Sequence, residues 1–337
     1  MKIIVPIINN DSGNAVYFRS LKAELARRGI SVELRQFSPL FECAPVLARA
    51  SSWLQATAET PDIVHSNADY GVAFKRKRKP FVATVHHNVF DDGYQNFTTL
   101  TQKAYHFGLL KHRLARAIKE ADRIVAVSHS TKTSLERTFG ARNVEVIYNG
   151  IDTELFHPKA IQPAAEFAGK VRLLFVGNLI KRKGADLLPA IIKKLGGDYV
   201  LFYTAGMRRE TSFTAPNMIR RVVNSTADLV DLYNGADIFL FPSRLEGFGY
   251  AVGEAMACGK PVVCTDASSL PELVVDEKGG LLCQLDSVDE FSDKVRLLGR
   301  DEQLRRTMGE FNRNRIVSHF NISQMGASYG ELYRRSI

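Results

Sequence analysis

The residues best suited to chemistry lie in residues 239–271, FLFPSRLEGFGYAVGEAMACGKPVVCTDASSLP. Two carboxylates, Glu246 and Glu254, bracket a glycine-rich turn between a short apolar run and a helical pattern. A strand–glycine–helix unit directs backbone N–H groups and partial positive charge at whatever lies above the strand end, which suits an anion. A carboxylate would repel a phosphate. We therefore expect Glu254 to accept hydrogen bonds from sugar hydroxyls and Glu246 to face a substrate centre that becomes cationic.

The local pattern explains how these groups would be held. Residues 238–241 form a continuous apolar run, as in a strand buried on both faces of a parallel sheet. Gly247 and Gly249 permit tight or positive-φ backbone before a helix over 250–258, and residues 261–264 form the next strand. Taken singly, each glutamate is more simply interpreted as a solvated side chain; together with the glycines and strands, the pattern is specific.

Strands and helices alternate along the whole chain, which predicts βαβ units and parallel sheets. In the first half we expect strands at 3–8, 31–35, 61–65, 81–85, 124–127 and 144–147. The helices between them include 15–28, with Val16, Leu21 and Leu25 inward, and a long helix with Leu100, Phe107, Leu110 and Leu114 on one face. A turn-rich break places the domain boundary near residue 160. Strands at 172–176, 199–203 and 219–223 and helices at 184–195 and 226–234 follow, then a helical tail from Val288 interrupted near 319–321.

Composition sets the class of protein. The 337 residues suit one large or two medium domains, and 45% hydrophobic with 24% charged residues is ordinary soluble composition. No apolar run approaches the ~20 residues that span a bilayer, and the start of the chain is better interpreted as a strand than as a signal peptide. Four cysteines without C-x-x-C spacing predict buried free thiols in a reducing cytoplasm: Cys43, Cys258, Cys264 and Cys283.

The positive charge is unevenly divided. Residues 1–160 hold 22 Lys and Arg against 15 Asp and Glu, a net +7, and residues 161–337 hold 23 against 21, a net +2. The excess suggests an anionic partner for the first half, whether membrane surface, charged saccharide or nucleic acid.

The stretch at 239–271 resembles the E-x7-E signature of retaining GT-B glycosyltransferases of the family-4 type, with Glu246 and Glu254 at its two positions. Further segments look like landmarks of that family in the usual order: PDIVH at 61–65, DRIVAVS at 122–128, VIYNGID at 146–152, and VG at 176–177 followed by KG at 183–184. The resemblance covers nearly the whole chain. It implies an α/β fold of two Rossmann-like doubly wound domains facing across a cleft, with an acceptor domain at 1–160, a nucleotide-sugar domain at 161–318 and a C-terminal helix at 319–337 returning to the first domain.

The resemblance also implies donor-site roles. A nucleoside diphosphate leaving group needs cations, and Lys183 matches the family's lysine. Asn178 stands where the family has a basic residue, so the second cation must come from Lys181, Arg182 or the Arg208-Arg209 turn. Glu254 would bind the nucleoside ribose, and Glu246 with His86 the transferred sugar. The remaining donor-site candidates are Gly13, Val223, Gly247, Phe248 and Gly249, with Ser268 and Ser269 as weaker ones. A solvated basic turn at 181–183 is the plain alternative.

His86 ends an expected strand in the half that would bind the acceptor, and the adjacent His87 is an equal alternative on spacing. A dense basic run lies in the same half, before His86: Lys75, Arg76, Lys77, Arg78 and Lys79. More cations lie on the next helix, interleaved with aromatic residues: Lys103, Lys111, Arg113, Arg116 and Lys119. Contact with an acidic acceptor or an anionic membrane is favoured over a nuclear localisation signal, a nucleic-acid grip and a merely solvated turn.

The sequence therefore predicts a glycosyltransferase that moves a sugar from a nucleotide-diphosphate sugar to an acceptor hydroxyl with retention. The resemblance points to cell-surface polysaccharide, lipopolysaccharide or glycolipid assembly on the inner face of the cell membrane. Partners are the donor, a saccharide or lipid-linked acceptor and an anionic membrane, with no nucleic acid. No D-x-D triplet occurs, so no metal or other cofactor is expected. A GT-B epimerase or phosphorylase is the enzyme alternative, and a non-enzymatic polyanion-binding protein is the distant one.

Overall fold

A computed structural model describes residues 1–8, 13–38, 60–162, 164–205 and 215–337. These residues form two compact units: unit 1 comprises Met1–Gly150 with Ile322–Ile337, and unit 2 comprises Ile151–Asn321. The boundary expected near residue 160 lies inside unit 2, because the division falls after Gly150. Cys43, Arg208 and Arg209 lie outside the described residues, so the expectations for them stay predictions.

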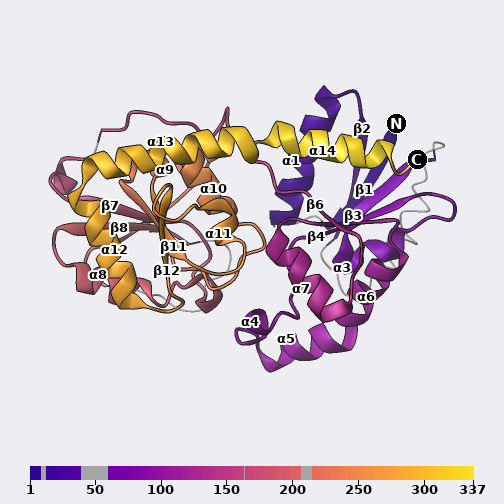
Figure 1. Ribbon diagram of the computed structural model, residues 1–337, viewed down its shortest axis with the longest axis horizontal. Coiled ribbons are helices and arrows are strands. Elements are labelled where there is room, and N and C mark those ends of the chain that lie inside the picture. The colour runs from indigo at the N-terminus through magenta and orange to yellow at the C-terminus, as the bar shows by residue number, and fades with distance from the viewer. Residues whose placement is uncertain (9–12, 39–59, 163, 206–214) are drawn as a thin grey trace. The chain divides into compact units, whose positions relative to one another are not determined.

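Unit 1 is built on a six-stranded parallel sheet in the order β2-β1-β3-β4-β5-β6 (Figure 1). Its strands are β1 (Lys2–Ile8), β2 (Ser31–Phe37), β3 (Ile63–Asn67), β4 (Phe81–Val85), β5 (Arg123–Ala126) and β6 (Val144–Val146). Its helices are α1 (Gly13–Arg27), α3 (Ala68–Gly71), α4 (Asp92–Gln95), α5 (Leu100–Tyr105), α6 (Lys111–Glu120), α7 (His129–Phe139) and α14 (Ile322–Arg334). A short 3-10 helix, η2 (Val72–Phe74), follows α3.

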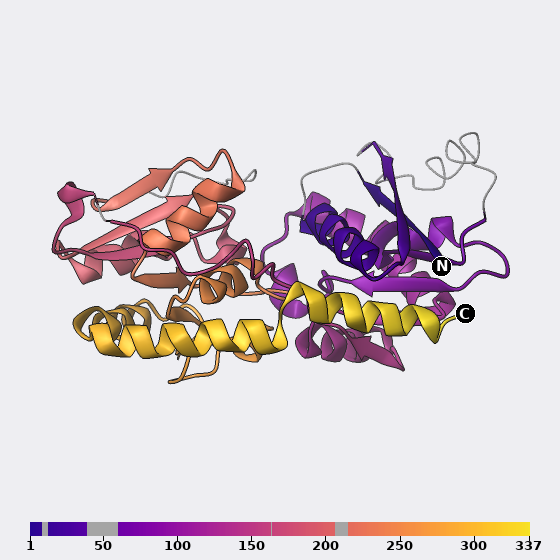
Figure 2. The same cartoon turned by 90° about the horizontal axis from the view of Figure 1, so that it is seen from above.

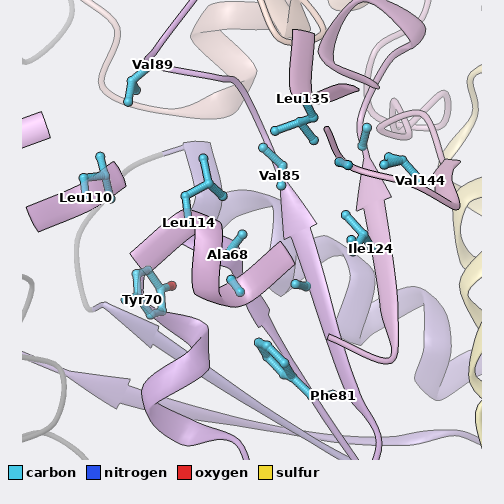
Figure 3. Close-up of a cluster of buried hydrophobic side chains, with 14 of the residues drawn as sticks. Ala68, Tyr70, Phe81, Val85, Val89, Leu110, Leu114, Ile124, Leu135 and Val144 are labelled. Carbon is cyan, nitrogen blue, oxygen red and sulfur yellow. The ribbon is translucent and has the colours of Figure 1, made fainter. Parts of the chain in front are cut away.

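Alternate residues of each strand pack into separate cores on the two faces of this sheet. In β4, Phe81, Ala83 and Val85 join a cluster with α3, α6 and α7 (Figure 3), whereas Val82 joins a cluster with α1 and α14. Both faces of the strand are therefore covered, and all five of its residues are buried.

The long helix expected over 100–121 is interrupted by a π-helical turn, η3 (His106–Leu110), between α5 and α6. The turn changes the angular spacing of the side chains, so the 3- and 4-residue pattern does not hold across it. Leu110 and Leu114 are buried as expected, but Leu100 is 85% exposed and Phe107 46% exposed. The expectation that all of them share one buried face is wrong; His106 is buried in place of Phe107.

Helix α14 packs against α1 within unit 1 (Figure 2). The guanidinium of Arg28 bonds Glu24 in α1 and also donates to the carbonyl and hydroxyl oxygens of Ser323 at 2.8 Å. This face of α1 buries Tyr17, Phe18, Leu21 and Leu25, whereas Val16 is 49% exposed. The inward placement expected for Val16 is wrong, because the α1 face that meets the sheet and α14 is centred on the aromatic pair that follows it.

Unit 2 is a second six-stranded parallel sheet, in the order β12-β11-β10-β7-β8-β9. Its strands are β7 (Val171–Phe175), β8 (Tyr199–Thr204), β9 (Met218–Arg221), β10 (Ile238–Phe241), β11 (Val262–Thr265) and β12 (Gly280–Cys283). Its helices are α8 (Leu188–Leu195), α9 (Thr226–Gly235), α10 (Tyr250–Ala257), α11 (Leu270–Leu273), α12 (Val288–Arg300) and α13 (Glu302–His319), with short 3-10 helices η4 (Ala165–Phe167) and η5 (Lys181–Lys183).

The sequence pattern did not predict strand β12, because this strand has only four residues between two turns. Cys258, Cys264 and Cys283 are buried free thiols, as expected. Among the described helices, none is both long enough and apolar enough to cross a membrane.

The close approach of α14 to α1 can be tested with two glycines of the same helix. A Cβ at Gly326 would overlap the Cγ atom of the buried Glu24 and displace it from its ion pairs with Arg27 and Arg28. A Cβ at Gly330 would meet Ile30 at 3.5 Å and the Arg334 guanidinium at 3.9 Å, which are ordinary contacts. Gly326→Ala should lower the unfolding free energy of unit 1 by about 1–3 kcal/mol, whereas Gly330→Ala should leave it unchanged or raise it by up to about 1 kcal/mol. Urea unfolding measures both, and equal effects of the two variants would contradict this packing.

Candidate functional site

The sheet of unit 2 reverses its strand order between β10 and β7, both of which have their carboxyl ends at the same edge. In open parallel sheets, ligands bind outside the carboxyl ends of the strands at such a switch point. The segments that leave these two strands carry Lys183 and Glu246, the residues that the sequence singled out.

The loop after β7 is fixed at both of its ends. The backbone N–H of Gly177 donates to the Thr204 hydroxyl at 3.2 Å, at the end of β8. Residues 181–183 then form η5, and Gly184 ends it with φ +70°. A Cβ at Gly184 would overlap the carbonyl oxygen of Pro242, so only glycine lets the two loops approach this closely. Helix α8 consequently begins at Leu188. The helix start expected at residue 184 is therefore wrong.

Lys183 and Glu246 form an ion pair at the centre of the site. The Lys183 ammonium lies 2.5 Å from Glu246 Oε1, and the two side chains are only 17% and 8% exposed. The Ser243 hydroxyl donates to the same oxygen at 2.6 Å. Glu246 Oε2 has no hydrogen-bond partner in the part of the chain that the structure describes, so it can accept a bond from a ligand. The Lys183 ammonium also lies 5.4 Å from the ring centroid of Phe241.

The charge state of this pair follows from its surroundings. Burial raises the pKa of the Glu246 carboxyl, but the cations of Lys183 and Arg182 and two hydrogen bonds outweigh it and hold that pKa below its ordinary value. Glu246 is therefore ionised at neutral pH. Burial lowers the pKa of Lys183, and the Glu246 carboxylate opposes that effect.

Two arginines join the loops after β7 and β10. Arg182 donates to the carbonyl oxygen of Leu245 at 2.8 Å. Arg244 holds Asp186 with two hydrogen bonds of 2.7 and 2.9 Å and Asp286 with one of 2.6 Å. Its backbone N–H donates to the carbonyl oxygen of Arg182 at 2.9 Å. Because bidentate arginine–carboxylate pairs fix geometry as well as charge, Arg244 keeps η5 beside Glu246.

The loop around Glu246 is also held from the far side by two serines. The Ser268 hydroxyl accepts from the Glu246 backbone N–H at 2.9 Å, and the Ser269 hydroxyl donates to the Glu246 carbonyl at 3.2 Å. These hydroxyls, expected as weak ligand contacts, hold the loop in this structure.

The glycine-rich turn differs in part from the expectation. Gly249 has φ +95° and is the residue before α10, whereas Gly247 has no positive φ. Phe248 is buried and packs edge-on against Tyr250 at 5.5 Å between ring centroids.

Glu254 lies on α10 and is partly buried. The hydroxyl of the buried Tyr233 donates to its Oε2 atom at 2.7 Å. Burial raises the pKa of Glu254 to about 7, and the Tyr233 bond offsets only part of that rise. Its Oε1 atom has no hydrogen-bond partner within the described segments. Glu254 thus combines one fixed oxygen with one available oxygen and is partly protonated near neutral pH.

Two other candidates follow strands of this sheet. Asn178 lies directly after Gly177 in the loop that ends β7. Val223 follows the edge strand β9 and is partly buried. These positions alone do not test the donor-site roles of Asn178 and Val223, which stay predictions.

In unit 1, His86 directly follows β4 at the carboxyl edge of that sheet. Its ring meets Tyr17 edge-on at 4.6 Å between centroids, and burial together with the His87 imidazole lowers its pKa to about 3. His87 stacks on Tyr94 at 5.6 Å. Gly13 opens α1, and a Cβ there would meet no described atom within 4 Å.

The basic run lies at the other edge of the same sheet, because it precedes β4 whereas His86 follows it. Lys75 donates to the backbone carbonyl of Glu120 at the end of α6 at 2.7 Å, and Lys77 and Arg78 are exposed. Arg78 has φ +59° in the turn. The run therefore continues from the end of α6 and does not adjoin His86.

One cavity of unit 2 is separate from this chemistry. Its volume is about 560 Å³, and it lies at the amino ends of β7 and β10 around the Arg172–Asp237 ion pair. We place the functional site at the opposite, carboxyl ends of these strands, where the ion pair and the fixed loops lie.

Sequence reasoning missed the residues that hold the site in place. Ser243, Tyr233 and Arg244 contact the predicted residues but match no motif of their own. Tyr233 is 21 positions from Glu254, and Arg244 is 58 positions from Asp186, so only the fold brings them together. A buried serine directly after a strand end was the one available signal, since Ser243 follows Phe241 and Pro242.

Family models match both units. Residues 34–155 match the model described as Glycosyltransferase Family 4, and residues 157–315 match Glycosyl transferases group 1. An uncharacterised glycosyltransferase of Methanocaldococcus jannaschii is 29% identical over 199 residues, which are 58% of this chain and 54% of that protein. An alpha-maltose-1-phosphate synthase of Mycolicibacterium smegmatis is 27% identical over 249 residues, 65% of this chain and 64% of that protein. The chain thus spans between about half and two thirds of these curated relatives.

Solved structures share the fold over the full chain. Sucrose-phosphate synthase of Thermosynechococcus elongatus superposes with a TM-score of 0.84 at 20% identity, covering 99% of this chain and 98% of that one. The Anabaena protein Alr3699/HepE, in complex with UDP-glucose, gives 0.79 at 18% identity and covers 99% and 100%. Both the matched family models and the two doubly wound sheets therefore place this chain in the family-4 (group 1) glycosyltransferases, with the GT-B fold.

Proposed function

We propose that the protein is a retaining glycosyltransferase that moves a sugar from a nucleotide-diphosphate sugar to an acceptor hydroxyl. The observation that carries the proposal is the buried Lys183–Glu246 pair at the switch point of unit 2, between loops fixed by Arg244. The UDP-glucose bound to the Anabaena protein of the same fold supports a nucleoside diphosphate donor. Screening nucleotide sugars for turnover, with and without candidate acceptors, tests it; turnover without any acceptor would favour an epimerase or phosphorylase.

Charge development explains the division of roles. As the bond to the diphosphate breaks, negative charge grows on the phosphate oxygens and positive charge on the sugar ring. Lys183, with Arg182 beside it, would stabilise the diphosphate, and Glu246 Oε2 would face the sugar. The acceptor hydroxyl would attack from the face that the phosphate leaves, with His86 near the transferred sugar. Glu254 would accept hydrogen bonds from the ribose. These cations supply the charge at the diphosphate, so the proposed mechanism uses no metal.

We further propose that the acceptor lies at an anionic membrane on the cytoplasmic side, in the assembly of a cell-surface saccharide such as lipopolysaccharide. Basic side chains lie along α6 from Lys111 to Lys119, and the Lys75–Glu120 contact joins the end of this helix to the run at 75–79. We call these two sets of basic residues together the basic strip. The exposed Leu100 and Phe107 lie at the other end of this strip, and the Lys111 ammonium lies 5.5 Å from the Phe107 ring centroid. Exposed apolar side chains beside cations are typical of segments that bind at a membrane interface.

Replacing the central lysine should remove the positive charge at the proposed diphosphate site while keeping a hydrogen-bond donor beside Glu246. Lys183→Gln keeps a donor that can bond Glu246 but no positive charge, so turnover should fall about a hundredfold through loss of roughly 3 kcal/mol of transition-state stabilisation. Lys193→Ala, at an exposed position of α8, should change turnover little. Steady-state kinetics on the turned-over donor measures both. Full activity of Lys183→Gln would remove Lys183 from the diphosphate site.

The raised pKa of Glu254 predicts how nucleotide affinity depends on pH. Ribose hydroxyls donate to the ionised carboxylate, so binding should weaken as pH falls through about 7, by about tenfold between pH 8 and pH 6. Calorimetric titration with UDP, GDP and ADP over that range measures this. Glu254→Gln should bind more weakly and lose this component, because titration of the nucleotide itself is common to both proteins. Glu246→Gln should instead lower turnover more than affinity. A wild-type pH profile identical to that of Glu254→Gln would exclude the ribose role.

The basic strip predicts salt-sensitive binding to anionic vesicles. Each cation near such a surface contributes on the order of 1 kcal/mol, so binding at low salt should be lost above ~0.3 M, where the Debye length is well below 10 Å. Lys77→Glu/Lys111→Glu/Lys119→Glu should abolish sedimentation with phosphatidylglycerol vesicles and leave donor hydrolysis intact. The control Arg142→Glu/Lys193→Glu/Lys278→Glu carries the same charge change at exposed positions that are not part of the strip. If the native protein ignores these vesicles in dilute buffer, or both triple variants behave alike, the membrane placement is wrong.

A further inference from the structure

A chain of buried polar side chains lies next to His86 in unit 1. Its members come from four elements and are called the tyrosine network here: Tyr17 of α1, His65 of β3, Thr84 of β4, and Tyr329 and Tyr333 of α14. Tyr17 bonds Tyr329, which bonds the Thr84 hydroxyl at 3.0 Å. Thr84 bonds His65 Nε2 at 2.7 Å, and His65 Nδ1 bonds Tyr333 at 2.6 Å. All of these side chains are buried.

The protons of this network can be placed by counting donors. With Tyr17 donating to Tyr329, the single hydroxyl proton of Tyr329 goes to Thr84. The Thr84 proton then has one acceptor left among its contacts, His65 Nε2, so the His65 proton lies on Nδ1 and is donated to Tyr333. Burial and the neighbouring His86 imidazole lower the pKa of His65 to about 3, which keeps the ring neutral as this arrangement requires. Every bond from Tyr17 to Tyr333 is thereby satisfied.

Among the described residues, His86 has no such hydrogen-bonded anchor. Its Nε2 atom is buried without a hydrogen-bond partner in the described chain. Its ring is oriented by edge-on contacts instead, with Tyr17 at 4.6 Å and 81° between ring planes and with Phe18 at 6.2 Å and 83°. The position of a ring that is held by packing depends on how firmly its neighbours are held. Tyr17 is the neighbour whose own position is fixed by a hydrogen bond, through Tyr329.

We propose that Tyr17 is the positioning residue of His86 and that Tyr329 of α14 holds Tyr17 in place. The catalytic consequence rests on the role proposed above for His86 at the transferred sugar. Helix α14 then contributes to the acceptor half of the reaction without touching a substrate. The specific prediction concerns the Tyr17–Tyr329 bond: removing either hydroxyl should loosen His86, whereas an equally buried hydroxyl elsewhere in unit 1 should not matter.

The experiment uses conservative Tyr→Phe variants of the full-length chain, which keep the ring and therefore the packing. Tyr17→Phe and Tyr329→Phe should each lower kcat about tenfold with little change in the KM for the donor, because a small misplacement of a reacting group affects the chemical step. The double variant should lose less activity than the product of the two single losses, because both substitutions remove the Tyr17–Tyr329 bond, although Tyr329→Phe also removes the bond to Thr84. Tyr70→Phe is the matched control: Tyr70 is buried in the other hydrophobic cluster of unit 1 and should retain full activity.

A second measurement does not depend on turnover. Diethyl pyrocarbonate modifies neutral imidazoles, and peptide mass spectrometry gives the rate for each histidine. Modification of His86, relative to the exposed His112, should rise several-fold in Tyr17→Phe and Tyr329→Phe and stay at the native value in Tyr70→Phe. Thermal unfolding of all variants shows whether a change reflects local loosening or loss of the fold.

The outcomes separate the two proposals. Native kcat and native His86 modification in Tyr17→Phe would overturn the positioning role, whatever His86 does. Full transfer activity in His86→Ala would overturn the function proposed for His86, and the modification rates would still decide whether Tyr17 positions it. Multiplicative losses in the double variant would show that the two hydroxyls act separately, which contradicts the proposed bond.

Discussion

The buried contact between Lys183 and Glu246 is the interaction on which the organisation of unit 2 depends. Two opposite charges at 2.5 Å, with side chains 17% and 8% exposed, are stable only where each compensates the other. That requirement explains the surrounding construction. Gly184 lets the two loops touch, and Arg244 fixes one loop to the other. Ser243 bonds the Glu246 carboxylate, and Ser268 and Ser269 bond its backbone. Each contact limits the freedom of one of the two charges.

The same pair illustrates how a site can be preorganised before its ligand arrives. If Lys183 left Glu246, a buried carboxylate would lack a counter-ion. An incoming diphosphate would therefore have to share the ammonium with Glu246. A carboxylate that already holds one cation also remains ionised when a positive charge develops nearby. In the proposed mechanism, this one ion pair would supply both signs of charge that the departure of a glycosyl group calls for.

The sequence predicted the elements whose signal is local. The strand β10, the turn with Gly249 and the helix α10 are encoded in one continuous stretch, and the structure has them within a residue of the expected bounds. The prediction of one long helix was wrong at the π-turn, because hydrophobic periodicity cannot show a change in helical pitch. The predicted start of α8 was too early, because the constraint on Gly184 comes from Pro242 in another loop. Tyr233, Ser243 and the tyrosine network were beyond reach for the same reason: their partners are distant in the chain and their residue types are common in cores.

Helix α14 belongs to unit 1 although all of unit 2 precedes it in the chain. Tyr17 and Tyr329 are separated by 312 positions, so the bond between them closes one of the longest loops in the molecule. During synthesis, residues 1–150 leave the ribosome long before α14 exists, and their sheet must wait with the α14-facing surface of α1 uncovered. Unit 2 can complete its own sheet in that interval. The unit that begins first therefore finishes last, and a chaperone that shields apolar surface would have its longest task at the amino-terminal half of this protein.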